Sequence, residues 1–415
     1  MKPAHLVLLY LFAAAPLFSQ STHSQPPCTP APSCDTGQLS AVGADGYTHY
    51  YEAYVPEGLP SPPSMLIWLP GMGAGSGAAW NHPPQLPANG GGSYQLKAFA
   101  DAEKVIVLWI APTCRQSNAT PSLACTILSP ELDWYFDINY FSSSMSPIAQ
   151  DSAFIHSLIG TAVNTWGVDP SRIAMFGFST GAFMAHRYPL DEPGDVMGIA
   201  AFEGQLWAQL SSGCTGLICP ETPPYAPATA VYIAHGTADA TIPAVGGTFN
   251  GWHGTGAPTN KNTFPSVDTT FGYWMNSSCP NGTVTTSGGT NTNIIVAAIS
   301  SISGNGTMAI ATCASTCGAN PTGIYAIDGT SNSGFNSKTV VVATDSGTSF
   351  TFPSPIVGTG TGGYLYLTSK LVSGCTGNRE IEYVTNVGGK HIPPDQTAIT
   401  RAWQFLALFP LTSKE

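Results

Sequence analysis

Charged residues are scarce in this sequence of 415 residues. They make up 9% of it, with 13 Lys and Arg against 24 Asp and Glu, and no run of basic residues occurs. A formal net charge of −11 without a basic patch argues against nucleic acid or an anionic membrane surface as a partner. The low charge, together with 45 Gly and 35 Pro, also excludes a coiled coil and a highly charged disordered tail.

Long apolar runs are missing as well. The longest is the ten-residue stretch Leu6–Ala15, which ends before Pro16, whereas a membrane-spanning helix needs about 18 apolar residues. A run of this length between a basic N-terminus and a polar stretch is typical of a secretory signal. We therefore expect a signal peptide at 1–20, a Pro/Ser-rich linker at 21–36, and a mature protein that is extracellular or periplasmic and not held in a membrane.

The cysteines do not form a zinc-binding pattern, because the close pairs have no matching second pair and no His-x-x-x-His motif accompanies them. Ten cysteines, an even number, in an exported protein indicate disulfides instead. The spacing suggests the pairs Cys28–Cys34, Cys114–Cys125, Cys214–Cys219, Cys313–Cys317 and, across a long gap, Cys279–Cys375.

Short continuous apolar runs, separated by much longer stretches, are typical of strands buried on both faces of a parallel sheet. A helical pattern lies between them at 148–166, where Gly167 and then Pro170 end it. This alternation of strands and helices predicts a doubly wound α/β sheet. The expected strands are an early alternating one at 47–55 and the runs Met65–Leu69, Val105–Ile110, Ile173–Phe176, Val196–Phe202 and Ala230–Ala234.

The pattern changes after residue 279. From Pro280 to Leu371 the sequence has four charged residues and short alternating strands separated by Gly, Asn and Ser. We expect a small all-β module at 280–372, inserted into an α/β domain at 37–279 and 373–415 that a strand at 381–384 and a helix at 397–408 complete. A disordered low-complexity insert is the alternative, which the β-branched and aromatic content weakens. The expected module strands are Met308–Ala311, Thr339–Val342, Phe350–Phe352 and Tyr364–Leu367.

A Gly-x-Ser-x-Gly motif at 177–181 follows the predicted strand Ile173–Phe176 and precedes a helical pattern. A strand-to-helix elbow holds such a serine in a tight turn at the carboxyl edge of a sheet, with its hydroxyl accessible. The alternative is a glycine-rich turn with a capping serine. The context favours Ser179 as a nucleophile.

A nucleophilic serine needs a base and an acid that orients the base, in the chain order Ser, acid, His for this kind of sheet. Asp239 lies on the turn after Ala230–Ala234, and His391 on a turn after the later strand at 381–384. We therefore expect Asp239 as the acid and His391 as the base. The other candidates fit less well: His253 in a glycine-rich loop, His235 at a strand end, and Asp268 without a preceding strand.

Two backbone N–H groups should stabilise the oxyanion that forms during attack on a carbonyl. One belongs to Thr180, directly after the nucleophile. The other is expected from Met72, in the glycine-rich segment after the strand Met65–Leu69. The same glycines do not predict a phosphate site, because no Lys-Ser/Thr follows to complete a Walker loop.

These residues resemble a secreted esterase family of the α/β-hydrolase superfamily that includes feruloyl esterases and polyhydroxybutyrate depolymerases. The resemblance covers about 40–279 and 373–410. Pro393 stands where the depolymerase branch commonly has Trp, so the feruloyl esterase branch is the more similar. The motifs that carry the resemblance are Asp45-Gly46, Gly-Val-Asp-Pro-Ser-Arg-Ile at 167–173, the Ser179 elbow, His-Gly-Thr-Ala-Asp at 235–239 and Gly-Gly-x-His at 388–391.

The resemblance implies an α/β-hydrolase fold and a serine esterase that requires no cofactor or metal. The expected partner is an ester substrate, polymeric in nature, with feruloyl esters of plant polysaccharide as the first expectation. A polyhydroxybutyrate or other polyester depolymerase is the alternative within the family. A serine peptidase and a non-catalytic adhesion or binding protein are the rivals outside it.

Overall fold

The computed structural model describes residues 34–36, 39–43, 48–71, 96–114, 132–134, 151–206, 208–209, 218–219, 229–248, 263–288, 293, 295–375 and 379–411. The expected signal peptide, most of the expected linker, Met72 and His253 lie outside these residues. So does one cysteine of each of the pairs Cys28–Cys34, Cys114–Cys125 and Cys214–Cys219. Within the described part, no helix is long and apolar enough to span a membrane.

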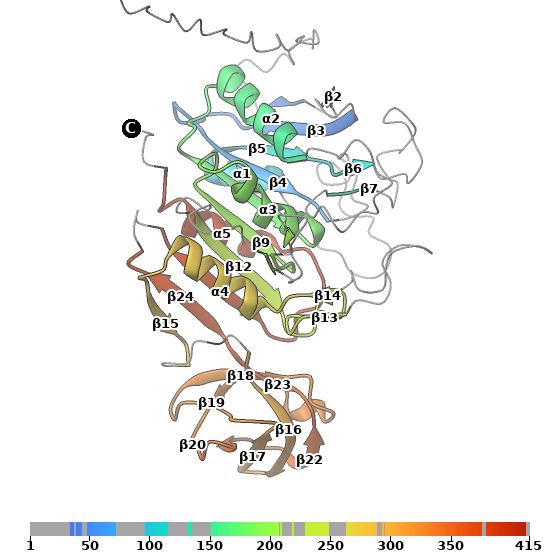
Figure 1. Ribbon diagram of the computed structural model, residues 1–415, viewed down its shortest axis with the longest axis vertical. Helices are drawn as coiled ribbons and strands as arrows, with labels where there is room; N and C mark the ends of the chain where they lie inside the picture. Colours follow the sequence, from blue (N-terminus) through green and yellow to red (C-terminus); the bar gives the residue numbers. More distant parts are fainter. Residues whose placement is uncertain are drawn as a thin grey trace, which may run out of the picture.

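A large mixed sheet forms the upper part of the molecule in Figure 1. It has eleven strands in the order β1-β3-β5-β4-β8-β9-β12-β25-β24-β15, with β2 paired to β3. The run from β5 to β25 is parallel, and the flanking strands are antiparallel. The strands are β1 (Cys34–Asp35), β2 (Leu39–Val42), β3 (Thr48–Val55), β4 (Ser64–Leu69), β5 (Val105–Ile110), β8 (Ile173–Phe178), β9 (Gly198–Phe202), β12 (Ala230–Gly236), β15 (Thr283–Thr286), β24 (Ser369–Ser373) and β25 (Ile381–Asn386).

Helices cover both faces of this sheet, which confirms the predicted doubly wound α/β architecture. One core packs α2 (Asp151–Trp166), α3 (Thr180–Asp191) and α4 (Val267–Ser278) on one face. The other core packs α1 (Leu96–Glu103) and α5 (Gln396–Leu406) on the opposite face. Because both faces are covered, β4, β5 and β8 have every residue buried, as their continuous apolar sequences predict.

The predicted elements of the α/β part coincide with observed ones, with ends that differ by a few residues. The sequence missed α1 and α4.

The N-termini of α4 and α5 are capped by side chains: Ser266 accepts from the Thr269 N–H, and Asp395 accepts from the Ala398 N–H. Among the described residues, three short two-stranded sheets lie outside the large one: β6 (Thr113–Cys114) with β7 (Leu132–Asp133), β10 (Ala208–Gln209) with β11 (Ile218–Cys219), and β13 (Gly247–Thr248) with β14 (Thr263–Phe264).

A second, eight-stranded sheet lies beyond the β15 edge of the large sheet (Figure 1). Its own apolar core includes Tyr325, Phe350 and Phe352. The four predicted strands are present, while the sequence missed the longest one, β16. The strands are β16 (Ile295–Asn305), β17 (Met308–Cys313), β18 (Ile324–Asp328), β19 (Ser337–Val341), β20 (Thr344–Asp345), β21 (Ser349–Pro353), β22 (Val357–Thr361) and β23 (Tyr364–Leu367), with a 3-10 turn at Ser333–Phe335.

The two ends of the expected insertion, 280–372, pair with the large sheet. Strand β15 pairs with β24, and β24 pairs with β25, so the second sheet itself runs from 295 to 367. The Cys279–Cys375 disulfide joins the two chain segments that flank this pair, with the Cα atoms 4.7 Å apart. The predicted Cys313–Cys317 disulfide is also present. The assignment of residues 280–372 to a separate domain stays a prediction.

Candidate active site

The turn between β8 and α3 holds Ser179 in an unusual backbone conformation. Its φ is 57° and its ψ is −123°, in the left-handed half of the map that non-glycine residues rarely adopt. Its N–H donates to the Phe202 carbonyl at 3.0 Å, which ties the turn to the neighbouring strand β9. This is the sharp elbow that the motif predicts.

The glycines of the motif are required by close backbone contacts. A Cβ atom on Gly177 would lie 2.1 Å from the Gly181 carbonyl oxygen, and one on Gly181 would lie 2.1 Å from the Leu69 carbonyl oxygen. A Cβ on Gly71 would lie 2.9 Å from the Ser179 Cβ. The end of β4, the elbow and the start of α3 therefore meet at distances that no side chain could occupy.

The structure brings the side chains of Ser179, His391 and Asp239 into one hydrogen-bonded chain. His391 Nε2 is 2.8 Å from Ser179 Oγ, and His391 Nδ1 is 2.7 Å from Asp239 Oδ2. An ionised carboxylate can only accept, so the imidazole carries its hydrogen on Nδ1 and leaves Nε2 free to accept from the serine hydroxyl. This arrangement can remove the hydroxyl proton during nucleophilic attack.

The loops that carry the two partners follow adjacent parallel strands. Asp239 lies on the turn after β12, and His391 lies on the turn after β25, which pairs with β12 in parallel. Asp239 Oδ1 accepts from the backbone N–H groups of Thr241 and Ile242 at 2.7 and 2.8 Å. Those bonds fix the carboxylate so that Oδ2 faces His391.

Of the two expected oxyanion donors, only Thr180 is described. It is the first residue of α3, and backbone N–H groups in the first turn of a helix have no partner within the helix. The chain that leads to Met72 passes beside Ser179 at Gly71. The buried indole of Trp134 donates to the Pro70 carbonyl at 2.7 Å, which holds this chain segment in place.

The comparisons with known proteins agree with this topology. Residues 115–250 match the family model described as phospholipase/carboxylesterase. The match covers less than half of the chain and includes Ser179 and Asp239 but not His391. The sheet topology and this match identify the fold. The chain has the α/β-hydrolase fold.

No curated protein matches the chain. Among solved structures, an acetyl xylan esterase from Aspergillus awamori is 11% identical, with 89% of this chain and 99% of that chain covered and a TM-score of 0.43. A ferulic acid esterase is 11% identical over 50% of this chain and 80% of that chain, with a TM-score of 0.32. A poly(3-hydroxybutyrate) depolymerase from Bordetella parapertussis is 14% identical over 50% and 67%, with a TM-score of 0.33.

Neighbours with scores this low bear on neither substrate nor mechanism. The family match and the α/β-hydrolase fold support an ester hydrolase of that type.

Sequence reasoning missed Glu203, whose carboxyl lies next to that of Asp239. Glu203 follows β9, has a φ of 53° and is 5% exposed. Its Oε2 accepts from the Gly236 N–H at 2.7 Å. Burial raises the pKa of the Glu203 carboxyl well above its usual range, the bond from Gly236 opposes this, and the neighbouring Asp239 raises it further. The sequence signal that could have pointed to Glu203 is its position directly after a predicted buried strand.

His235 completes this buried group. Its side chain is fully buried, with Nδ1 3.1 Å from the Gly236 carbonyl oxygen and 3.4 Å from Glu203 Oε2. Burial lowers its pKa to about 4, so His235 is neutral at pH 7. Its environment is that of a strand-end histidine held by the backbone, as the sequence suggests, and not that of a base beside Ser179.

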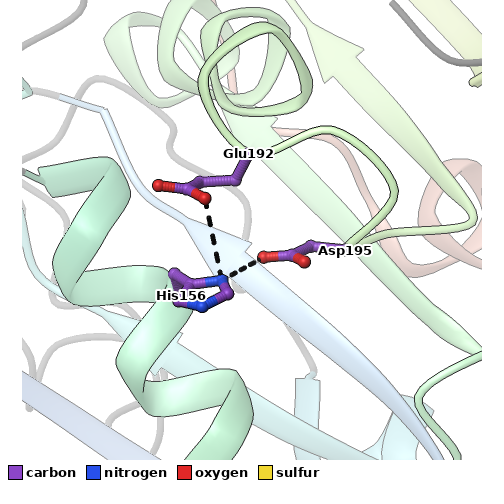
Figure 2. A group of neighbouring side chains, drawn as sticks. All are labelled: His156, Glu192 and Asp195. Atoms are coloured by element: carbon purple, nitrogen blue, oxygen red, sulfur yellow. Dashed lines mark hydrogen bonds and ion pairs between the residues drawn. The ribbon is translucent and has the colours of Figure 1, made fainter. Parts of the chain in front are cut away.

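Within the described residues, two groups have enough possible ligands to hold a metal ion. The first is Glu203, His235 and Asp239, whose oxygens already accept hydrogen bonds from the backbone and from His391. The second, shown in Figure 2, joins His156 on α2 to the chain after α3, with Nδ1 2.5 Å from Asp195 Oδ2 and 3.8 Å from Glu192 Oε2. Tyr188 also donates to Asp195 Oδ2. The side chains of both groups are thus already engaged in hydrogen bonds or ion pairs with neighbouring protein groups.

Proposed function

We propose that this protein is a secreted serine esterase in which Ser179 is the nucleophile, His391 the general base and acid, and Asp239 the residue that orients His391. The observation that carries the proposal is the continuous hydrogen-bonded chain from Ser179 Oγ through His391 to Asp239. The strained backbone of Ser179 supports it, because such strain is concentrated at functional residues.

The proposed reaction uses these groups in two stages. As Ser179 Oγ attacks the ester carbonyl, His391 Nε2 takes the hydroxyl proton, and the negative charge that develops on the carbonyl oxygen is stabilised by N–H groups assigned to Thr180 and Met72. When the tetrahedral intermediate collapses, the C–O bond to the alcohol breaks and His391 returns the proton to the leaving oxygen. Water, deprotonated by the same imidazole, then cleaves the acyl-serine and releases the acid.

The proposed substrates are feruloyl esters of plant polysaccharide, with a polyester such as polyhydroxybutyrate as the second candidate. Pro393, two residues after His391, supports the first of these through the family resemblance described above. Secretion is supported by the N-terminal apolar run and by the two disulfides of the described part.

The decisive experiment measures hydrolysis of a short-chain nitrophenyl ester by the wild type and by Ser179→Ala, His391→Ala and the double variant. Each single variant should lose several powers of ten in kcat, and the double variant should lose little more, because the residues act in one step. Ser157→Ala on the exposed side of α2 is the matched serine control. Turnover that survives in Ser179→Ala contradicts the proposal.

The substrate is tested separately with methyl ferulate, acetylated xylan, polyhydroxybutyrate and a peptide amide. Fastest turnover of methyl ferulate supports the feruloyl assignment. Preference for the polyester or for the peptide amide overturns that assignment in favour of a depolymerase or a peptidase.

Asp239→Asn should keep its fold and lose activity, since the amide favours the wrong imidazole tautomer.

A further inference from the structure

The second sheet contacts the loops that carry the acid and the base. Thr237, two residues before Asp239, donates its hydroxyl to Asp328 Oδ2 at 2.5 Å. Asp328 is the last residue of β18 and is 7% exposed. The same Thr237 hydroxyl accepts from the Gly388 N–H at 2.8 Å, and Gly388 lies three residues before His391.

These two hydrogen bonds have a fixed direction. A backbone N–H can only donate and an ionised carboxylate can only accept, so Thr237 must point its hydrogen at Asp328 and its lone pair at Gly388. Hydrogen bonds to a charged acceptor are about twice as strong as neutral ones. Asp328 therefore fixes the rotamer of a side chain that bridges the acid loop and the base loop.

The two loops are close along their backbones as well. The N–H groups of Thr237 and Ala238 donate to the carbonyls of Asn386 and Gly389 at 3.0 and 2.9 Å. A Cβ on Gly236 would lie 2.3 Å from the Gly389 carbonyl oxygen. Such contacts leave no space for water between the loops, so their separation depends on these direct bonds.

The position of Asp328 is itself set by strand pairing. Asp328 pairs with Tyr364 in the register of β18 and β23. One residue, Thr368, separates β23 from β24, and its carbonyl accepts from the Thr385 N–H of β25 at 3.1 Å. The second sheet is thus linked through β24 to the strand that leads to His391.

We propose that Asp328 is a positioning residue, through which the second sheet sets the relative placement of the Asp239 and His391 loops by way of the Thr237 hydroxyl. The inference rests on the proposed function of Ser179, Asp239 and His391. It gives the second sheet a role in hydrolysis of any ester, soluble or polymeric, in addition to whatever surface it offers to a polymer.

The test compares Asp328→Ala, Asp328→Asn and Thr237→Val with the wild type on a soluble nitrophenyl ester. Asp328→Ala and Thr237→Val should each lower kcat by about 10- to 100-fold with KM nearly unchanged, because small displacements of a catalytic group cost up to about that factor. Asp328→Asn keeps an acceptor oxygen and should restore part of the loss. The double variant Asp328→Ala/Thr237→Val should lose no more than Thr237→Val alone, since Thr237→Val already removes the hydroxyl that binds both Asp328 and Gly388.

Asp345→Asn is the matched control. It removes the same charge from the same sheet, and Asp345 bonds to the nearby Gly347 N–H, so kcat should not change. If Asp328→Ala does not fold, Thr237→Val and Asp328→Asn, which keep the bulk of the side chains, still decide the matter.

Wild-type kcat in Thr237→Val, or a double variant that loses clearly more than Thr237→Val alone, would overturn the inference. A loss confined to an insoluble polymer would do the same and would leave the second sheet with a binding role only. Ser179→Ala distinguishes a failure of the proposed function from a failure of this inference. Full turnover in Ser179→Ala refutes the proposed function. An inactive Ser179→Ala together with unaffected Asp328 variants refutes only the role of Asp328.

Discussion

The two sheets of this protein bury their strands in different ways. In the large sheet β4, β5 and β8 are buried along their whole length, because helices cover both faces. In the second sheet β17 and β21 alternate buried and more exposed residues, because one side of each strand faces the shared core and the other faces outward. A sheet covered on both faces can present polar groups only at its strand ends, and Ser179, Asp239 and His391 all lie there.

Few charged residues occur in and beside the second sheet. The sequence from 280 to 371 has four charged residues: Asp328, Lys338, Asp345 and Lys370. Asp328 accepts from Thr237, and the buried Lys370 ammonium lies 4.2 Å from the centre of the Phe271 ring of α4. Asp328 thus serves a contact between the two sheets, whereas Lys370, on β24, serves a contact within the α/β part. A sequence with scattered charges reveals neither contact.

The largest expected effect concerns the tight packing at the strand ends of the large sheet. Gly181→Ala places a Cβ 2.1 Å from the Leu69 carbonyl oxygen, so it should displace the elbow and lower kcat by more than about 100-fold. Gly160→Ala on α2 is the control, because nothing lies within 4 Å of its Cβ position, and it should stabilise the helix by about 1 kcal/mol. Ester hydrolysis and thermal unfolding measure the two effects. An active Gly181→Ala enzyme would mean that the elbow tolerates a backbone shift.

The two disulfides should differ in strength according to the loops that they close. Cys279 and Cys375 are 96 residues apart, and Cys313 and Cys317 are 4 apart. In the chain-entropy model the disulfide that closes the long loop stabilises the folded protein by roughly 4 to 5 kcal/mol, and the one that closes the short loop by about 2 kcal/mol. Replacing both cysteines of a pair by Ser should therefore lower Tm more for the first pair. Equal losses of Tm would show that strain or residual structure decides the effect instead.

Acid should destabilise the α/β part before the second sheet. Burial lowers the pKa of His186 to about 3 and that of His235 to about 4, whereas residues 280–371 contain no histidine. A histidine whose folded-state pKa is lowered contributes stability above about pH 6.5 that is lost as the pH falls toward the folded value. The unfolding midpoint of the α/β part should therefore decrease as the pH is lowered from 6.5 to 4.

The measurement is tryptophan fluorescence, because the second sheet has no Trp and all nine lie outside 280–371. The Trp274 Nε1–H donates to His186 Nδ1 at 2.9 Å, so protonation of His186 must break that bond. His186→Gln should reduce the slope of stability against pH in this range. An unchanged slope would exclude His186 as a source of the acid sensitivity.

The smallest expected effect concerns Glu203. Its raised pKa means that folding favours the protonated carboxyl, so its contribution to stability is complete below about pH 4.5 and is lost as the pH rises toward the folded value. Glu203→Gln cannot ionise and should remove this loss. Urea unfolding of the two proteins from pH 5 to 9 should show curves that diverge as the pH rises. Parallel curves would mean that Glu203 is ionised in the native protein.

Much of the candidate site could be predicted because its signals are local. Ser179 lies between two glycines after an apolar run, and Asp239 and His391 each lie on a turn after a strand. In parallel sheets those turns gather at one edge. Glu203 also follows a strand, but nothing in the sequence tells that β9 adjoins β12, which is what places its carboxyl next to that of Asp239.

The sequence by itself determined the strands β3, β4, β5, β8, β9, β12 and β25 of the large sheet, since apolar period and run length report burial on one face or both. It also predicts the chain order Ser179, Asp239, His391 of the proposed nucleophile, acid and base. Only the tertiary structure decided that β15 and β24 extend the large sheet and that Asp328 reaches Thr237 across 91 residues. Strand pairing and single hydrogen bonds between distant segments depend on which segments meet, and the local pattern of a segment does not identify its partner.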